Sequence, residues 1–138
     1  MKTRTLFVTE YDMKRLQKLL AVEKRHGFEK KEHLKELENE LDRSTVVKSC
    51  DIPNDVITMN SMISLLDMDT EKKMKYTLVF PDHADSDNGK ISILAPIGTA
   101  LIGYRKGDII KWKVPGGEAR LKVLDILYQP EAAGEYEV

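Results

Sequence analysis

The run KISILAPIGTALIGYRKGD, at positions 90–108, constrains the fold of this chain more than any other segment. Its apolar residues at 91–94 predict a strand, because β-branched side chains favour extended backbone. Pro96 suits the first position of a helix, where no backbone N–H is needed, and the apolar pair at 101–102 gives that short helix a buried face. The residues at 106–108 then predict a turn that sends the chain back toward a sheet.

The second half of the chain contains further segments rich in β-branched and aromatic residues, separated by polar turns. We expect strands at 56–59, 62–66, 74–80, 109–114 and 118–127. Short connections of this kind favour antiparallel neighbours. The segment therefore predicts a small antiparallel sheet with one short helix, and the final residues, 129–138, form a polar tail.

The first half predicts two helices that form a hairpin. Thr9 can cap a helix that runs to about Arg25, and Gly27 can end it. A second helical pattern covers about 29–42, with leucines on one side. Two helices of about 14 residues would extend roughly 20 Å at 1.5 Å per residue. Since the periodicity is lost before Pro53, we divide this α+β chain into a helical hairpin at 1–50 and a sheet domain at 51–138.

Charge is distributed unequally between these two parts. Residues 1–50 carry 12 Lys and Arg against 9 Asp and Glu, whereas residues 51–138 carry 10 against 14, which leaves the larger part acidic. Because affinity for nucleic acids depends on clustered Lys and Arg, this balance predicts weak or no direct binding to nucleic acid.

The cysteine content and the N-terminus bear on the compartment. Cys50 is the one cysteine, so no internal disulfide can form, and neither a secretory signal nor a membrane span is evident. We therefore expect a cytoplasmic protein without a membrane partner. The histidines at 26, 33 and 83 do not have the spacing of a zinc site, and no cofactor is expected.

Several motifs together resemble one known family. VITMNS at 56–61, YTLV at 76–79 followed by Pro81, the run at 90–108, and the Pro-Gly-Gly turn at 115–117 occur in the same order and at similar spacing as in the C-terminal domain of the bacterial Gre transcript cleavage factors. The resemblance covers about residues 55–127. It implies an FKBP-like fold for this part of the chain.

The Gre resemblance also implies a function. In that family a helical hairpin enters the secondary channel of RNA polymerase, the FKBP-like domain docks on the channel rim, and acidic residues at the tip help to hold a catalytic magnesium ion. The matching tip candidates here are Glu23, Glu29 and Glu32, but lysines and arginines lie among them. The hairpin is also about half as long as that of the cleavage factors. We therefore expect no metal delivery and no catalytic residue in this chain.

A branch of the family matches these departures. DVITMNS at 55–61 and YQPEAAG at 128–134 resemble the regulator of nucleoside diphosphate kinase (Rnk) branch, in which the coiled coil is truncated. That resemblance implies a polymerase-binding protein that competes with other channel-binding factors without provoking cleavage. Pro96, Ile97 and Gly98 match the loop and helix start that face the polymerase rim. We expect a monomer, or a weak dimer formed through the apolar stripe of the hairpin.

Three alternatives remain open from sequence. The chain could be a true cleavage factor whose tip reaches the polymerase magnesium. It could instead be an FKBP-like peptidyl-prolyl isomerase, although only 7% of its residues are aromatic and such sites need an aromatic-lined pocket. The third is nucleic-acid binding without polymerase, which the basic hairpin would have to carry.

Overall fold

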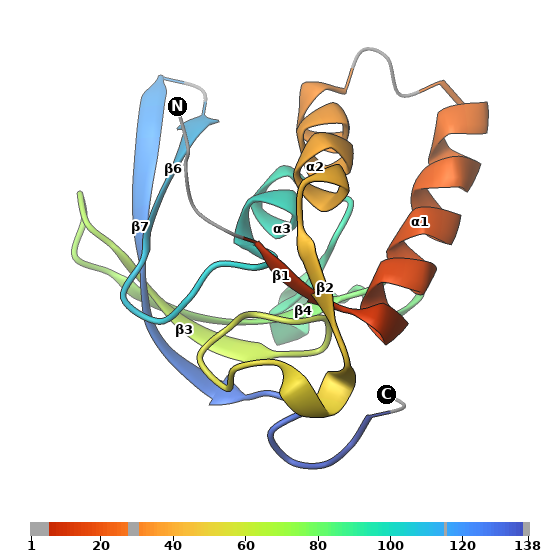
Figure 1. The fold of residues 1–138 in the computed structure, drawn as a ribbon. Coiled ribbons are helices and arrows are strands. Elements are labelled where there is room, and N and C mark those ends of the chain that lie inside the picture. The colour runs from red at the N-terminus through yellow and green to blue at the C-terminus, as the bar shows by residue number, and fades with distance from the viewer. Residues whose placement is uncertain (1–5, 28–30, 115, 137–138) are drawn as a thin grey trace.

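The computed structural model describes residues 6–27, 31–114 and 116–136. The chain begins with a strand and a helix that pack beside a second helix and strand (Figure 1). These elements are β1 (Phe7–Thr9), α1 (Glu10–Arg25), α2 (Glu32–Asp42) and β2 (Thr45–Val47). Thr9 caps α1 as predicted, because its Oγ1 accepts a hydrogen bond from the backbone N–H of Asp12 at 3.0 Å.

Two short strands close the base of the helical hairpin. β1 and β2 pair in parallel, with Phe7 opposite Thr45 and Thr9 opposite Val47. The sequence pattern did not predict a strand at β2, because Thr45 and Val46 are both exposed and the segment lacks the alternation of a half-buried strand. The pairing ties the two ends of the hairpin together: α1 follows β1 at one end of this short ladder, and α2 leads into β2 at the other end (Figure 1).

The second half forms a five-stranded sheet with a short helix. Its elements are β3 (Met62–Asp67), β4 (Lys73–Val79), β5 (Lys90–Ser92), α3 (Pro96–Leu101), β6 (Ile109–Val114) and β7 (Gly117–Tyr128). The spatial order is β5-β4-β3-β7-β6. The antiparallel prediction is wrong at one edge, because β5 pairs with β4 in parallel. The ten-residue connection at 80–89 contains two 3₁₀ turns, Pro81–His83 and Ser86–Asn88, and this length allows the chain to cross before it pairs again.

The predicted strand at 56–59 is also wrong. These residues form a buried loop in which the N–H of Ile57 donates to the carbonyl of Tyr104 at 2.8 Å, and Val56 makes an isolated bridge with Arg105. Asn60 follows with a left-handed φ of 67°. Such a conformation ends an extended segment, so the first strand of the sheet begins only at Met62.

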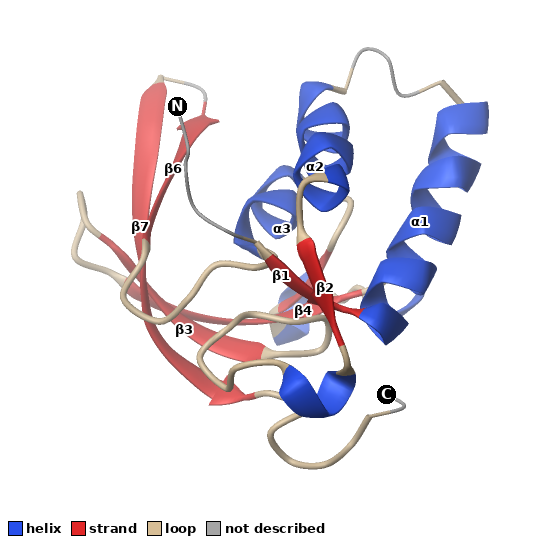
Figure 2. Cartoon of the chain, viewed as in Figure 1, coloured by secondary structure: helices blue, strands red, loops and turns tan. Residues whose placement is uncertain are grey.

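The helices all lie on one side of the sheet, as Figure 2 shows. One cluster of buried side chains includes residues of the hairpin, the sheet and α3. The leucine stripes of the hairpin are part of it: Leu16, Leu20, Leu34, Leu37 and Leu41 are each less than 5% exposed. The stripe therefore faces the core, and the expectation that it could serve as an exposed dimer contact is wrong.

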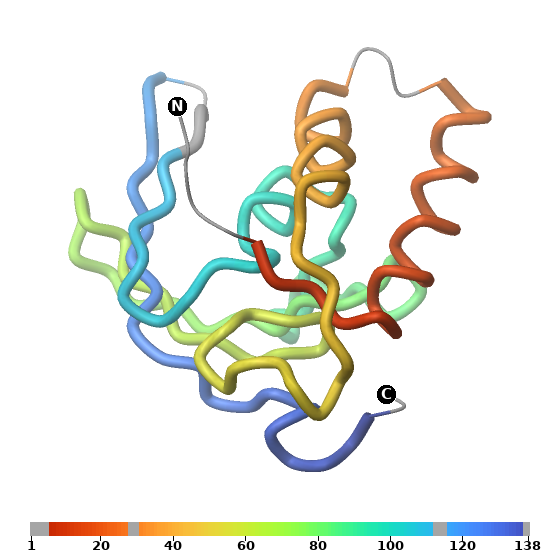
Figure 3. The backbone as a smooth tube through the Cα atoms, viewed as in Figure 1, coloured from red at the N-terminus to blue at the C-terminus, as the bar shows by residue number. Residues whose placement is uncertain are grey.

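The C-terminal segment also packs on the body of the protein. After β7 it passes beneath the loop that follows β2 (Figure 3). The side-chain amide of Gln129 donates to the carbonyl oxygens of Pro53 at 2.9 Å and Val56 at 2.7 Å. The predicted polar tail is therefore ordered through at least this residue.

Candidate functional site

The start of α3 is the first candidate surface. Pro96 occupies the first turn, as predicted, and its side chain is exposed. Ile97 is half-buried and packs against the hydrophobic core. Of the three predicted residues in this loop, Pro96 alone is exposed, so a direct contact with a partner would fall mainly on it.

Gly98 has a packing role. It is buried, and a Cβ atom added to it would lie 2.1 Å from the carbonyl oxygen of Ser92. No real Cβ approaches an oxygen that closely, so only glycine lets α3 sit against the end of β5. Gly98 therefore affects this surface indirectly, because the close approach that it allows fixes the position of α3 and, with it, that of Pro96.

The helical hairpin lies beside this candidate loop. α2 packs against α3, and a ring nitrogen of His33, Nε2, lies 3.0 Å from the carbonyl oxygen of Leu94, two residues before Pro96. His33 is thus a structural link between hairpin and loop. The sequence placed His33 only near the hairpin turn, because nothing local shows that α2 meets this loop.

The hairpin tip is only partly described. Glu23 lies half-buried near the end of α1, Glu32 is exposed at the start of α2, and Glu29 lies outside the described residues. The Nζ of Lys35 is 3.7 Å from the Oε1 of Glu32, and Lys24 pairs with Glu38 across the two helices at 3.5 Å. Basic side chains thus accompany the acids. Among the described residues, no group of three or more His, Cys, Asp or Glu side chains is arranged to hold a metal ion.

A buried carboxylate attaches α1 to the sheet domain. Asp12 is 1% exposed, and its Oδ2 accepts a hydrogen bond from the backbone N–H of Met59 at 3.1 Å. Its Oδ1 accepts another from Arg15 at 2.6 Å. Burial raises the pKa of Asp12 above its ordinary value, although the bonds from Arg15 and Met59 oppose that shift. The long-range bond of Asp12 has no local signature in the sequence, because its partner Met59 lies 47 residues away.

Arg15 and Glu131 extend this polar contact. The guanidinium of Arg15 lies over the ring of Phe80, 4.6 Å from its centroid, and over a second aromatic ring on α1. On the other side, the hydroxyl of Thr58 donates to Glu131 at 2.7 Å. Burial raises the pKa of Glu131, and the hydrogen bond from Thr58 opposes the shift. The hairpin, the loop before β3 and the C-terminal segment are thus joined by charged and polar groups.

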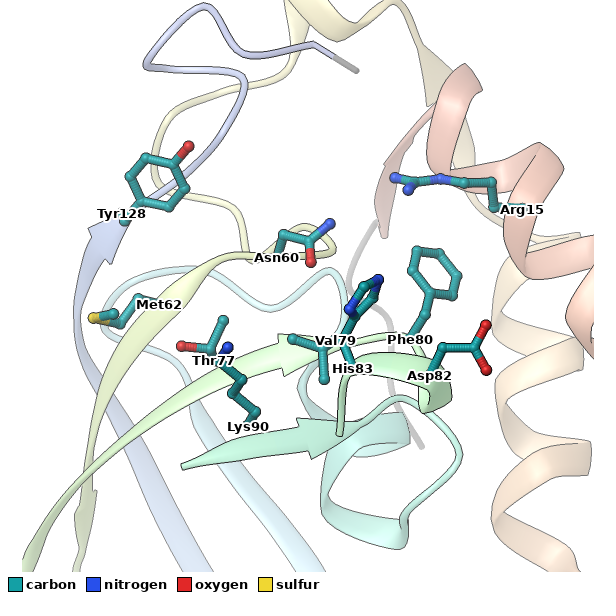
Figure 4. Close-up of a pocket in the computed structure, with 10 residues that line it drawn as sticks. All are labelled: Arg15, Asn60, Met62, Thr77, Val79, Phe80, Asp82, His83, Lys90 and Tyr128. Carbon is teal, nitrogen blue, oxygen red and sulfur yellow. The ribbon is translucent and has the colours of Figure 1, made fainter. Parts of the chain in front are cut away.

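A cleft of about 550 Å³ lies next to Arg15 (Figure 4). Arg15 and Tyr128 stand on opposite sides of it, and Asn60 and His83 lie between them. Met62, Thr77 and Lys90, on three adjacent strands, line its floor. The cleft combines cationic Arg15 and Lys90 with anionic Asp82, which leaves one net positive charge among these three residues.

Other predicted features are structural or isolated. Tyr104 is buried in the core, and Leu94 is half-buried against it. Cys50 is exposed and its thiol lies 3.8 Å from a carboxylate oxygen of Asp51. Within the described parts of the chain, no helix is both long and apolar enough to cross a membrane.

Comparison with known families decides the assignment. The family described as "Transcription elongation factor, GreA/GreB, C-term" matches residues 52–128, more than half of the chain. The chain belongs to the GreA/GreB family. A second family, described as "Rnk N-terminus", matches residues 4–47 of this Gre-family protein. The predicted resemblance to the Rnk branch is thereby confirmed.

Individual relatives agree with this assignment. The regulator of nucleoside diphosphate kinase of Escherichia coli (strain K12) is 38% identical to this Rnk-like protein over 133 residues, which cover 96% of each chain. Transcription elongation factor GreA of Syntrophotalea carbinolica is 38% identical over 108 residues, which cover 78% of this chain and 68% of that factor.

A solved structure has the same architecture. The transcription elongation factor GreA/GreB from Nitrosomonas europaea superposes with a TM-score of 0.77 at 36% identity, and the match covers 90% of this chain and all of that one. The mixed sheet with its short helix and N-terminal helices is therefore a Gre-like fold. This chain is a Rnk-like transcription factor of the Gre family.

Proposed function

We propose that this Rnk-like protein binds RNA polymerase at the secondary channel, and that it competes there with other channel-binding factors without stimulating transcript cleavage. Membership of the Gre family supports the choice of partner. In this proposal, Pro96 at the start of α3 contacts the channel rim, Ile97 and Gly98 shape that contact, and the hairpin occupies the entrance.

The packing of the hairpin on the body is the observation that carries the non-cleaving role. The second helix has only 11 residues, which corresponds to about 16 Å at 1.5 Å per residue. Its leucines are buried as far along as Leu34, and those of α1 as far as Leu20. His33, one residue nearer the tip than Leu34, also contacts the body through the carbonyl oxygen of Leu94. The described helices are thus held on the body close to the tip, which favours a short reach.

The charge of the tip supports the same conclusion. Magnesium is a hard cation that prefers carboxylate oxygens, and it is repelled by ammonium groups. Near Glu32 and Glu23, the lysines Lys35 and Lys24 reduce the negative potential that a metal-delivering tip would need. We therefore propose that the protein acts by occupancy and has no chemistry of its own.

Binding to core RNA polymerase in competition with a full-length Gre factor tests this function. We expect competition, and no increase in transcript cleavage by stalled complexes at saturating protein. Stimulated cleavage would show that the tip reaches the metal and that the protein is a cleavage factor. Failure to bind or compete would overturn the proposed function.

A matched pair of variants tests the docking loop. Pro96→Glu places a charge at an exposed first-turn position that tolerates acidic residues, so α3 should still form. We expect polymerase affinity to fall at least about tenfold, or about 1.4 kcal/mol. Ala132→Glu adds the same charge to an exposed position of the C-terminal segment and should have little effect. Equal affinities for the two variants would place the contact elsewhere.

A further inference from the structure

The outer face of the sheet carries a concentration of lysines that the acidic balance of this half of the chain conceals. Alternate residues of each strand point to opposite faces. On β3, Ile63 and Leu65 are buried beneath the helices, whereas Met62, Ser64 and Leu66 belong to the opposite face. That second face lies on the side of the sheet away from α1, α2 and α3 (Figure 2).

Among the residues whose side chains the structure describes, the strand register places five lysines on this outer face. Leu66 pairs with Lys73 on one side and Lys122 on the other, and Ser64 pairs with Lys75. Thr77 pairs with Met62 on one side and with Lys90 on the other. On β6, Ile109 pairs with Lys122, and Lys111 lies two residues further along on the same face. We call this surface the lysine face; its lysines are Lys73, Lys75, Lys90, Lys111 and Lys122, and Arg120 lies on it opposite Lys111.

Within the described parts of the chain, these lysines have no acidic partner. Four of the five are exposed, Lys122 is half-buried, and none forms an ion pair with a described residue. Two nearby carboxylates are already engaged, since Asp125 pairs with Lys106 at 3.5 Å and Asp69 pairs with Arg120 at 2.8 Å. Glu118 lies near Arg120. The face therefore has a net positive charge on a chain whose formal net charge is −1.

We propose that the lysine face binds the phosphate backbone of single-stranded nucleic acid. Lysine ammonium groups on flexible stems act as point charges that suit phosphates, whereas bidentate recognition would call for arginine. Lys73 and Lys75 are two residues apart on one strand, so their Cα atoms are separated by roughly 7 Å. An uncovered sheet is also a surface on which several RNA- and DNA-binding folds hold an extended strand.

The shape of the face favours a single strand over a duplex. The sheet curves around α3, so its outer face is convex (Figure 2). A stiff duplex can touch a convex surface over only a short length, while a flexible strand can follow it. Apolar side chains lie among the lysines and provide contacts for unstacked bases: Met62, Leu66 and Ile109. An aromatic ring is close by as well, since Tyr128 is the β7 partner of Met62.

Fluorescence anisotropy with the full-length protein and an oligouridine of about 15 nucleotides tests this proposal. If all five lysines neutralise one phosphate each, the slope of log affinity against log salt is about −3.5, and affinity falls about 100-fold between roughly 50 and 200 mM salt. Lys73→Gln combined with Lys75→Gln should reduce that slope by about 1.4. Lys14→Gln combined with Lys18→Gln removes two exposed charges from α1 and should leave the slope unchanged.

Each result decides the proposal separately from polymerase binding, because polymerase is absent from the assay. No binding at low salt, or equal losses in the two double variants, would overturn it. Equal or tighter binding of a duplex of the same length would overturn the assignment to single strands. Unchanged oligouridine affinity of the double variant on β4 would also overturn it; if that variant lost affinity for polymerase in the separate competition assay, the lysine face would instead recognise an acidic protein surface.

Discussion

At the scale of single residues, buried Asp12 and half-buried Glu131 add polar contacts near the junction of the hairpin and the sheet domain. Asp12 bonds across the junction to the backbone of Met59, and Glu131 accepts from Thr58. Such groups are costly to ionise away from water, and their partners recover only part of that cost. The junction is therefore specified by polar geometry as well as by the leucine core.

Glu131→Gln tests the cost of ionisation at this junction. The pKa of Glu131 is raised in the folded protein, so between its ordinary value and the raised value the folded state holds more protons than the unfolded state. The free energy of unfolding from this group therefore falls as pH rises through that window. Glutamine stays neutral and can still accept from Thr58, so the variant should gain stability relative to wild type as pH rises from about 4.5 to about 7.

Urea unfolding at both pH values measures this difference. Glu36→Gln, at an exposed position of α2, is the control and should show no such trend. A wild type that becomes more stable than Glu131→Gln with rising pH would mean that Thr58 and its surroundings favour the carboxylate.

At the scale of elements, the close approach of α3 to β5 fixes the candidate docking loop. Gly98→Ala would force the backbone of α3 away from Ser92, because the new Cβ cannot coexist with that carbonyl. We expect a loss of about 1–3 kcal/mol in the free energy of unfolding, typical of an overpacked site. Polymerase affinity should fall as well, since Pro96 moves with the helix.

Thr99→Ala is the matched control for Gly98→Ala. Its hydroxyl donates to the carbonyl of Pro96 at the exposed side of the same helix, so the expected loss is less than about 1 kcal/mol. Chemical denaturation measures both variants. A Gly98→Ala protein as stable as Thr99→Ala would show that the helix can shift without cost.

The elements that sequence could predict are those with local signatures. The cap at Thr9, the proline at the start of α3 and the periodic leucines of the hairpin all have nearest-neighbour causes. The parallel pairing of β5, the strand β2 and the loop at 56–60 depend on partners far along the chain, so periodicity did not reveal them.

The candidate site divides in the same way. The position of Pro96 in the first turn of the helix follows from the local sequence, and its side chain is exposed. The burial of Gly98 does not follow from the local pattern, because it depends on close approach to Ser92 of the preceding strand. The contacts of Asp12 with Met59 and of His33 with Leu94 join residues tens of positions apart. The charge balance of residues 51–138 concealed the lysines of the outer sheet face, because their collection on one face depends on the register between strands.

At the scale of the whole molecule, the hairpin and the sheet share one hydrophobic cluster. We therefore expect residues 1–50 and 51–138 to unfold together, even though we assign them to separate parts. Differential scanning calorimetry should show one transition with an enthalpy of about 95 kcal/mol near 60 °C, from about 0.7 kcal/mol per residue. The calorimetric and van't Hoff enthalpies should agree. Two resolved transitions, or a calorimetric enthalpy well above the van't Hoff value, would show that the parts unfold independently.

The parallel ladder of β1 and β2 has a consequence for how such proteins can diverge. Because residues 7–9 and 45–47 are tied side by side, the helices between them form a closed excursion whose two ends are fixed by the base. Whole helical turns inserted between α1 and α2 would lengthen the excursion while the ladder, the leucine core and the sheet kept their register. Reach toward a distant target can therefore change by insertion at the tip alone, independently of the surface that docks.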